Sequence, residues 1–122
     1  MPPTARFLLI EGTSDEHWHT VFEKALNPLG ELYTGTEDEA VQLVHSSAYD
    51  IIFLDASAIN DLVALVTQLR HLLATTPIIV LTASPTWNLA RDLFRAGATD
   101  YLRKSLNQEA VRTIAATVLR RG

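Results

Sequence analysis

The chain has 122 residues, of which 48% are hydrophobic and 20% are charged, and its formal net charge is −4 at pH 7. These values favour one folded domain over residues 1–122, exclude a disordered chain, and leave no basic surface for binding nucleic acid. The chain has no cysteine, which excludes disulfides and thiolate metal sites.

The N-terminus lacks the layout of a signal peptide, because its apolar segment is only Phe7–Ile10. No apolar run in the chain approaches the ~20 residues that cross a bilayer. We therefore expect a cytoplasmic protein that makes no contact with a membrane.

Five strand patterns alternate with helical patterns from the N-terminus to the C-terminus. Ile51–Leu54 is apolar without alternation, as expected for a strand that is buried on both faces. The order of the patterns predicts a parallel sheet covered by helices on both faces. The expected strands are Phe7–Ile10, Glu31–Tyr33, Ile51–Leu54, Ile78–Leu81 and Thr99–Leu102.

Apolar residues at helical spacing predict one helix after each strand. Capping boxes are expected at Thr13 with Glu16, at Thr36 with Glu39 and at Ser105 with Gln108, and Gly97 is expected to end the fourth helix. The apolar positions are Trp18, Val21, Phe22, Ala25 and Leu26; Ala40, Val41, Leu43 and Val44; Leu62, Leu65, Val66, Leu69, Leu72 and Leu73; Trp87, Ala90, Leu93 and Phe94; and Val111, Ile114, Ala115, Val118 and Leu119.

Polar residues follow three of the expected strands. Asp55 comes directly after the third strand, Thr82 after the fourth, and Lys104 just after the fifth. The carboxyl ends of parallel strands border the crevice where ligands bind, so these side chains are expected to converge. A carboxylate, a hydroxyl and an ammonium group suit a small anion, or an anion that forms on the carboxylate itself.

Three segments resemble the receiver domain of bacterial two-component response regulators. They are Asp55 after its apolar strand, Val80–Ser84, and Ala96–Lys104. The resemblance covers essentially the whole chain and is most specific between Pro77 and Lys104. It implies a flavodoxin-like α/β fold of five strand–helix units with the strand order 2-1-3-4-5.

The resemblance also implies a role for each site residue. Asp55 would accept a phosphoryl group from a histidine kinase or a phosphotransfer protein, and Lys104 would pair with the phosphoryl oxygens. Thr82 would donate a hydrogen bond to the same group, and Tyr101 would turn inward in the coupled switch. Enzymatic activity stays open, since it would be limited to self-phosphorylation from a donor and autodephosphorylation.

The expected magnesium site departs from the family pattern. Receiver domains usually follow the first strand with two acidic residues, and this chain has Glu11 and Gly12 instead. The implied Mg²⁺ ligands are therefore Asp55, the backbone carbonyl of Ser57, and Glu11 through water, and we expect weakened affinity. Substitution by Asp15 is disfavoured, because the capping interpretation places it in the first helical turn.

Two further positions depart from the family. The loop after Asp55, residues 56–62, lacks the usual Met-Pro pair and later glycine. Ser105 replaces a proline that often follows the lysine through a cis bond, so either the bond is trans or strain is retained.

Other kinds of site have weaker sequence patterns. His17 and His19 are two residues apart and do not share a helical face, so we interpret them as surface or capping residues. The hydroxyls of the first loop suggest a flavodoxin-type phosphate site, but acidic flanks oppose an anionic flavin.

Two functions remain as alternatives. The first is a phosphorylated receiver that signals through protein contacts, including a homodimer formed by the fourth helix, fifth strand and fifth helix. Trp87, Tyr101 and Arg103 are candidate contributors to that surface, although Trp87 could equally pack on the sheet. The second is a pseudo-receiver, a phosphorylation-independent interaction or dimerisation module, which Gly12 favours and the retained Asp55, Thr82 and Lys104 oppose.

Overall fold

A five-stranded parallel sheet forms the centre of the computed structural model, which describes residues 4–12, 16–104 and 107–121. The strand order is β2-β1-β3-β4-β5, which confirms the predicted topology. Each predicted strand is present, and backbone pairing extends most of them by one to three residues. The strands are β1 (Ala5–Ile10), β2 (Gly30–Gly35), β3 (Ile51–Asp55), β4 (Ile78–Thr82) and β5 (Asp100–Arg103).

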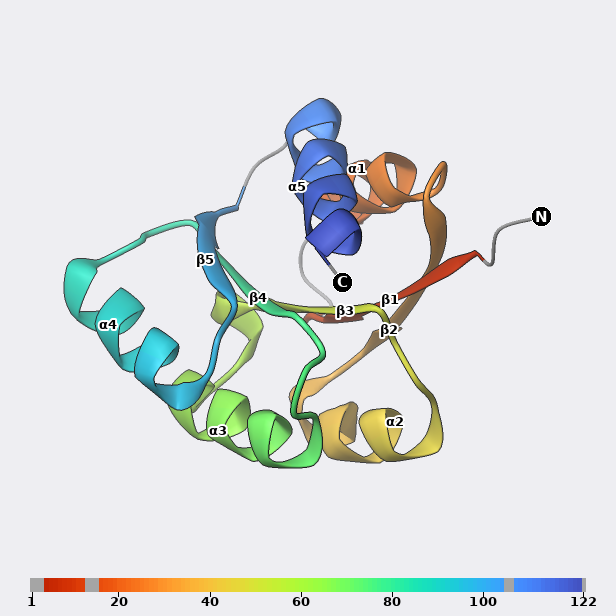
Figure 1. Ribbon diagram of the computed structural model, residues 1–122. Coiled ribbons are helices and arrows are strands. Elements are labelled where there is room, and N and C mark those ends of the chain that lie inside the picture. Colours follow the sequence, from red (N-terminus) through yellow and green to blue (C-terminus); the bar gives the residue numbers. More distant parts are fainter. Residues whose placement is uncertain (1–3, 13–15, 105–106, 122) are drawn as a thin grey trace.

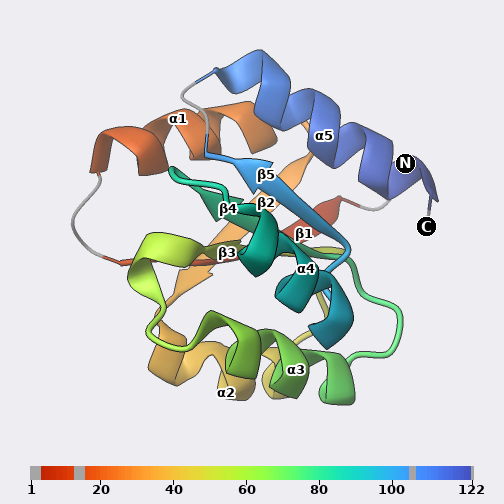
Figure 2. The same cartoon turned by 90° about the vertical axis from the view of Figure 1, so that its left-hand side faces the viewer.

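Helices cover both faces of the sheet (Figure 1 and Figure 2). On one face lie α1 (Glu16–Leu26) and α5 (Gln108–Arg121). The other face carries α2 (Ala40–Ser46), α3 (Leu62–Leu72) and α4 (Trp87–Ala96), with α4 beside the edge strand β5. Two short 3-10 turns, η1 (Glu37–Glu39) and η2 (Ala56–Ala58), precede α2 and follow β3. Among the described residues, no helix combines the length and apolar character needed to cross a bilayer.

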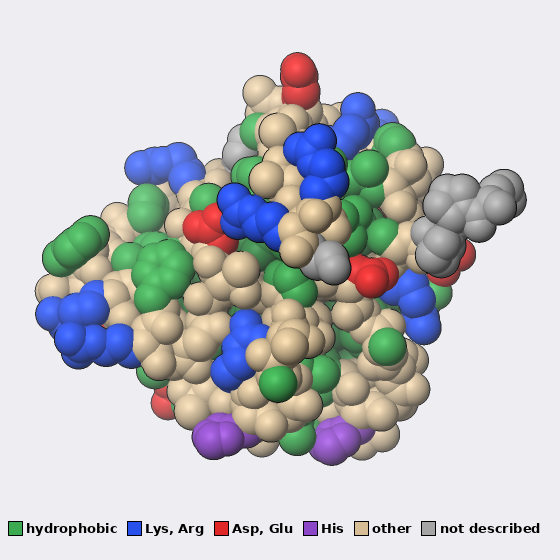
Figure 3. Space-filling model, in the orientation of Figure 1, with side chains coloured by type: hydrophobic (Ala, Val, Ile, Leu, Met, Phe, Trp, Pro, Cys, Tyr) green, Lys and Arg blue, Asp and Glu red, His purple; other side chains and the backbone are tan. Residues whose placement is uncertain are grey.

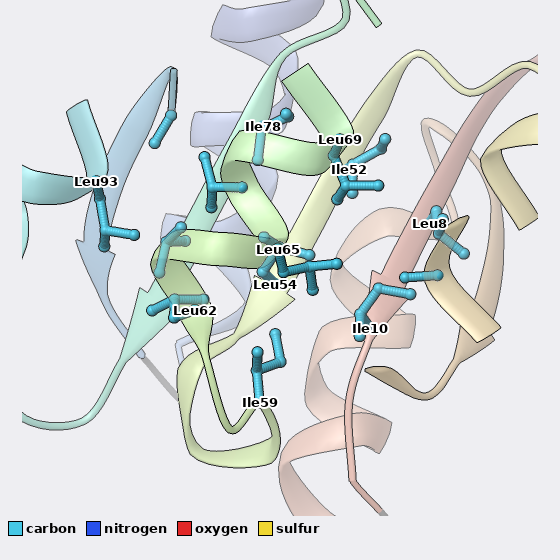
Figure 4. Close-up of a cluster of buried hydrophobic side chains, with 14 of the residues drawn as sticks. Leu8, Ile10, Ile52, Leu54, Ile59, Leu62, Leu65, Leu69, Ile78 and Leu93 are labelled. Atoms are coloured by element: carbon cyan, nitrogen blue, oxygen red, sulfur yellow. The ribbon is translucent and has the colours of Figure 1, made fainter. Parts of the chain in front are cut away.

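The hydrophobic core has two clusters, one on each face of the sheet, because successive side chains of a strand point to opposite faces. Leu8, Ile52 and Leu54 belong to one buried cluster with apolar residues of α2 and α3, part of which Figure 4 shows. Phe7 and Phe53, on the same strands, pack against α1 and α5. Residues of β1, β3 and β4 in both clusters are almost completely buried, which explains why their sequences are apolar without alternation.

Local polar contacts fix the ends of several helices. Thr36 and Glu39 form the predicted capping box, with the Thr36 N–H donating to Glu39 Oε1 at 3.0 Å, although the box begins η1 rather than α2 directly. Gly97 ends α4 with a φ of 118°, a left-handed conformation that glycine adopts without strain. The other two predicted capping boxes include Thr13 and Ser105, which lie outside the described residues.

The predicted apolar face of α4 is wrong in part. Leu93 is buried, but Trp87 is 83% exposed and Phe94 is 49% exposed. The helix lies at the edge of the sheet and turns Leu89, Leu93 and Ala96 toward the core, at positions separated by four and three residues. Trp87 therefore does not pack on the sheet, and α4 presents an aromatic outer surface.

Candidate functional site

The sheet brings Asp55, Thr82 and Lys104 to one edge, at the carboxyl ends of β3, β4 and β5. Asp55 is the last residue of β3 and pairs in register with Leu81, the neighbour of Thr82. The backbone N–H of Lys104 donates to the carbonyl of Thr82 at 2.7 Å. The three predicted residues therefore lie together, and both Asp55 and Thr82 are buried, with exposures of 3% and 7%.

Both carboxylate oxygens of Asp55 have donors. Oδ1 accepts hydrogen bonds from the backbone N–H of Ser57 at 3.1 Å and from the Ser57 hydroxyl at 2.7 Å. Oδ2 accepts from Lys104 Nζ at 3.1 Å. These contacts offset the cost of burying a carboxylate, and they place a cation beside one oxygen of this buried acid.

An aromatic ring borders Lys104. Nζ of Lys104 lies 4.3 Å from the centroid of the Trp18 ring, a geometry in which the face of the ring attracts the ammonium group. Trp18 belongs to α1, is 1% exposed and packs on Phe22. Because the ring is fixed in the core, α1 helps to hold the Lys104 ammonium against Asp55.

The hydroxyls of Thr82 and Tyr101 face the loop that leads into α4. Thr82 Oγ1 accepts from the backbone N–H of Ser84 at 3.1 Å, which leaves its own O–H as a donor. Tyr101 is half-buried, and its hydroxyl oxygen accepts from the N–H of Thr86 at 3.2 Å. Both residues therefore connect strand ends to the segment that begins α4.

On the β1 side of the site, the carboxylate of Glu11 is paired with His19. Nδ1 of His19 lies 2.5 Å from Glu11 Oε2, and Nε2 of the same ring lies 3.2 Å from Glu23 Oε2. Burial raises the pKa of Glu11 above its ordinary value; His19 lowers it, the charge of Asp55 raises it further, and Lys104 lowers it slightly. The His19 imidazole thus connects Glu11, at the end of β1, to Glu23 on α1.

The described residues do not fit a magnesium site as they are arranged. Mg²⁺ requires octahedral oxygen ligands, of which one or two are usually carboxylates. Glu11 is engaged by His19, Gly12 has no side chain, and both oxygens of Asp55 accept hydrogen bonds. Within the described ranges no group of three or more acidic, histidine or cysteine side chains could hold a metal ion. The predicted ligand Ser57 lies beside Asp55, whereas Asp15 is outside those ranges.

Sequence reasoning did not find the roles of Trp18 and His19. The sequence pattern places Trp18 only in the core, and it indicates that His17 and His19 are surface or capping residues. One available signal was Glu23, four residues after His19, since residues at that spacing are neighbours on a helix. The contact with Glu11 depends on how α1 packs and has no local signal.

Comparisons with known proteins identify the family and the fold. The family model of the response regulator receiver domain matches residues 16–116. A two-component response regulator from Clostridium difficile has 25% identity and a TM-score of 0.85, with 97% of this chain and 98% of that chain covered. An orphan response regulator of H. pylori has 22% identity and a TM-score of 0.85, covering 97% and 100%.

An atypical orphan regulator, described as having a phosphorylation-independent regulatory mechanism, has 22% identity and a TM-score of 0.80, covering 94% of this chain and 95% of that chain. At that identity the likeness concerns the fold alone. No curated protein matched the chain.

Proposed function

The chain belongs to the response regulator receiver domain family, and from this premise we propose that Asp55 accepts a phosphoryl group in two-component signalling. The observation that carries the proposal is the buried pair of Asp55 and Lys104, with 3.1 Å between Oδ2 and Nζ. A carboxylate is an adequate nucleophile for an activated phosphoryl group, and such transfer depends mainly on positioning and neutralisation of charge.

In the proposed reaction a carboxylate oxygen of Asp55 forms a bond to phosphorus while the bond from phosphorus to the donor breaks. The Lys104 ammonium, held between Asp55 and the Trp18 ring, neutralises charge on the phosphoryl oxygens. The Thr82 O–H donates to the same oxygens, and a shift of Thr82 toward them would carry the Ser84 N–H with it, because Thr82 Oγ1 accepts from that group. That movement would reach α4 through the loop that Tyr101 also contacts.

A receiver domain implies a kinase partner in general, and we propose a histidine kinase or a phosphotransfer protein as the donor. The communicating surface is α4, β5 and α5, used for a partner or for a homodimer. Figure 3 shows hydrophobic side chains beside Lys and Arg side chains at the edge where α4 lies. Exposed residues there include Trp87, Arg91, Phe94, Arg95 and Arg103.

A pseudo-receiver is the second candidate, and specific observations favour it. Receiver domains typically bind Mg²⁺, and the described residues here do not form such a site. The Asp55 side chain is 5% exposed, and both of its oxygens already accept hydrogen bonds within the protein. In this alternative the same α4–β5–α5 surface binds a partner without phosphorylation.

Intact mass measurement separates the two candidates. The wild-type chain and Asp55→Asn are incubated with a cognate kinase, or with acetyl phosphate, and their masses are compared. Under the proposal only the wild type gains the mass of one phosphoryl group. Asn has nearly the shape of Asp, so both chains should have the same circular dichroism spectrum.

An adduct on both chains would place the reaction at another residue and contradict the assignment of Asp55. No adduct on either chain, with a donor that labels a control receiver domain, would favour the pseudo-receiver.

A further inference from the structure

The contact between His19 and Glu11 lies where a receiver domain needs a carboxylate for its cation. Glu11 follows β1 directly, and its side chain is 13% exposed. The 2.5 Å separation from His19 Nδ1 places the imidazole against one carboxylate oxygen. His19 is further fixed at its other nitrogen by Glu23, one helical turn later. The ring is therefore held at both ends, with Glu11 as its closer partner.

The same helix also supplies Trp18, whose ring lies against Lys104. Two consecutive residues of α1 thus contact charged side chains of the site. Trp18 contacts Lys104 on the β5 side, and His19 contacts Glu11 on the β1 side. The contact between Trp18 and Lys104 keeps a cation at Asp55, and the contact between His19 and Glu11 occupies the carboxylate at the end of β1. Together they hold the pocket in an arrangement whose negative groups already have partners in the protein.

We propose that His19 is a positioning residue that withholds Glu11 from Mg²⁺, so that the pocket gains affinity for the ion when this contact is removed. The inference rests on the proposed function only for the location of the site. It assigns to α1 a control over metal binding that the family pattern of two acidic residues does not include. Gly12 has a separate effect, because it has no side chain to bind the ion, whereas Glu11 has a carboxylate that His19 already contacts.

Calorimetric titration with MgCl₂ at one fixed pH tests the proposal. The chains compared are wild type, His19→Ala, Gly12→Asp, and the double variant Gly12→Asp/His19→Ala. A Cβ at Gly12 would lie 3.3 Å from the Cβ of Ala58, so Gly12→Asp requires a small shift of η2. Side chains that hydrogen-bond a metal ligand typically change metal affinity about tenfold or more, and they usually support binding. The proposal gives His19 the opposite effect, because its contact with Glu11 occupies the carboxylate, so we expect the double variant to bind Mg²⁺ about tenfold more tightly than Gly12→Asp alone. Weaker binding by the double variant would show that His19 supports the ligand and would overturn the proposal.

His17→Ala is the matched control, since His17 is an exposed histidine of the same helix, and it should leave the affinity unchanged. Equal affinities for Gly12→Asp and the double variant would overturn the proposal, as would a double variant that shows no binding. If Gly12→Asp does not fold, wild type and His19→Ala decide the question by the same criterion. None of these readouts requires Asp55 to be phosphorylated, so a failure here is distinct from a failure of the proposed function.

Discussion

The two sides of the site differ in what their charged groups contact. On the β3–β4–β5 side, Asp55 and Lys104 contact each other and are both mostly buried. On the β1 side, Glu11 contacts His19, whose side chain is 31% exposed and which also contacts the exposed Glu23. The first side pairs two mostly buried groups, and the second pairs the mostly buried Glu11 with the more exposed His19.

The two sides of the site therefore depend on different elements of the fold. The sheet fixes the positions of Asp55, Thr82 and Lys104, because all three are at or just beyond the ends of neighbouring strands. The β1 side depends on a loop and on one face of α1, where a few side chains decide which partner Glu11 has. Substitutions should therefore have large effects on the first side and small effects on the second.

The largest effect is expected for Lys104→Ala. Breaking a mostly buried ion pair leaves an uncompensated carboxylate, and we expect a loss of about 3 kcal/mol in the free energy of unfolding. Urea denaturation of the variant and the wild type measures this loss. In an Asp55→Asn background the same substitution should cost much less, because no charge is left unpaired. An equal cost in both backgrounds would show that the pair does not contribute through its charges.

A smaller effect on the same side is expected for Ser57→Ala. The substitution removes the 2.7 Å hydrogen bond from the Ser57 hydroxyl to Asp55 Oδ1 but keeps the bond from the backbone N–H. We expect a loss of about 1 kcal/mol in the free energy of unfolding, measured by urea denaturation. A loss as large as that of Lys104→Ala would mean that Ser57, rather than Lys104, is the main partner of Asp55.

The smallest effect is expected for His19→Ala. Partly exposed ion pairs contribute little to stability, so we expect a change below about 1 kcal/mol in the free energy of unfolding. His17→Ala is again the control in the denaturation experiment. A cost for His19→Ala that exceeds that of Lys104→Ala would reverse the comparison between the two sides.

Much of this architecture could be predicted from the sequence because it depends on local patterns. The apolar run Ile51–Leu54 placed β3, and the rule for strand ends then placed Asp55 beside Thr82 and Lys104. Contacts that depend on how a helix packs on the sheet could not be predicted in the same way. The position of Trp18 against Lys104 depends on how α1 packs against the sheet.

The outer surface of α4 is a second example. Helical spacing groups Trp87 with Leu93, yet the first is 83% exposed and the second is fully buried. The position of α4 at the edge of the sheet decides which of its residues turn inward. That position cannot be predicted from the spacing of apolar residues alone.

The central claim is that Asp55 can accept a phosphoryl group although the β1 side of the site is occupied by an internal contact. The most direct test is the time course of phosphoryl incorporation from acetyl phosphate, with no kinase present, into the wild-type chain and Asp55→Asn, measured by intact mass with Mg²⁺ and with a chelator in its place. The account predicts an adduct that depends on Asp55 and forms at the same rate in both solutions. Incorporation that stops when the chelator is present would contradict it.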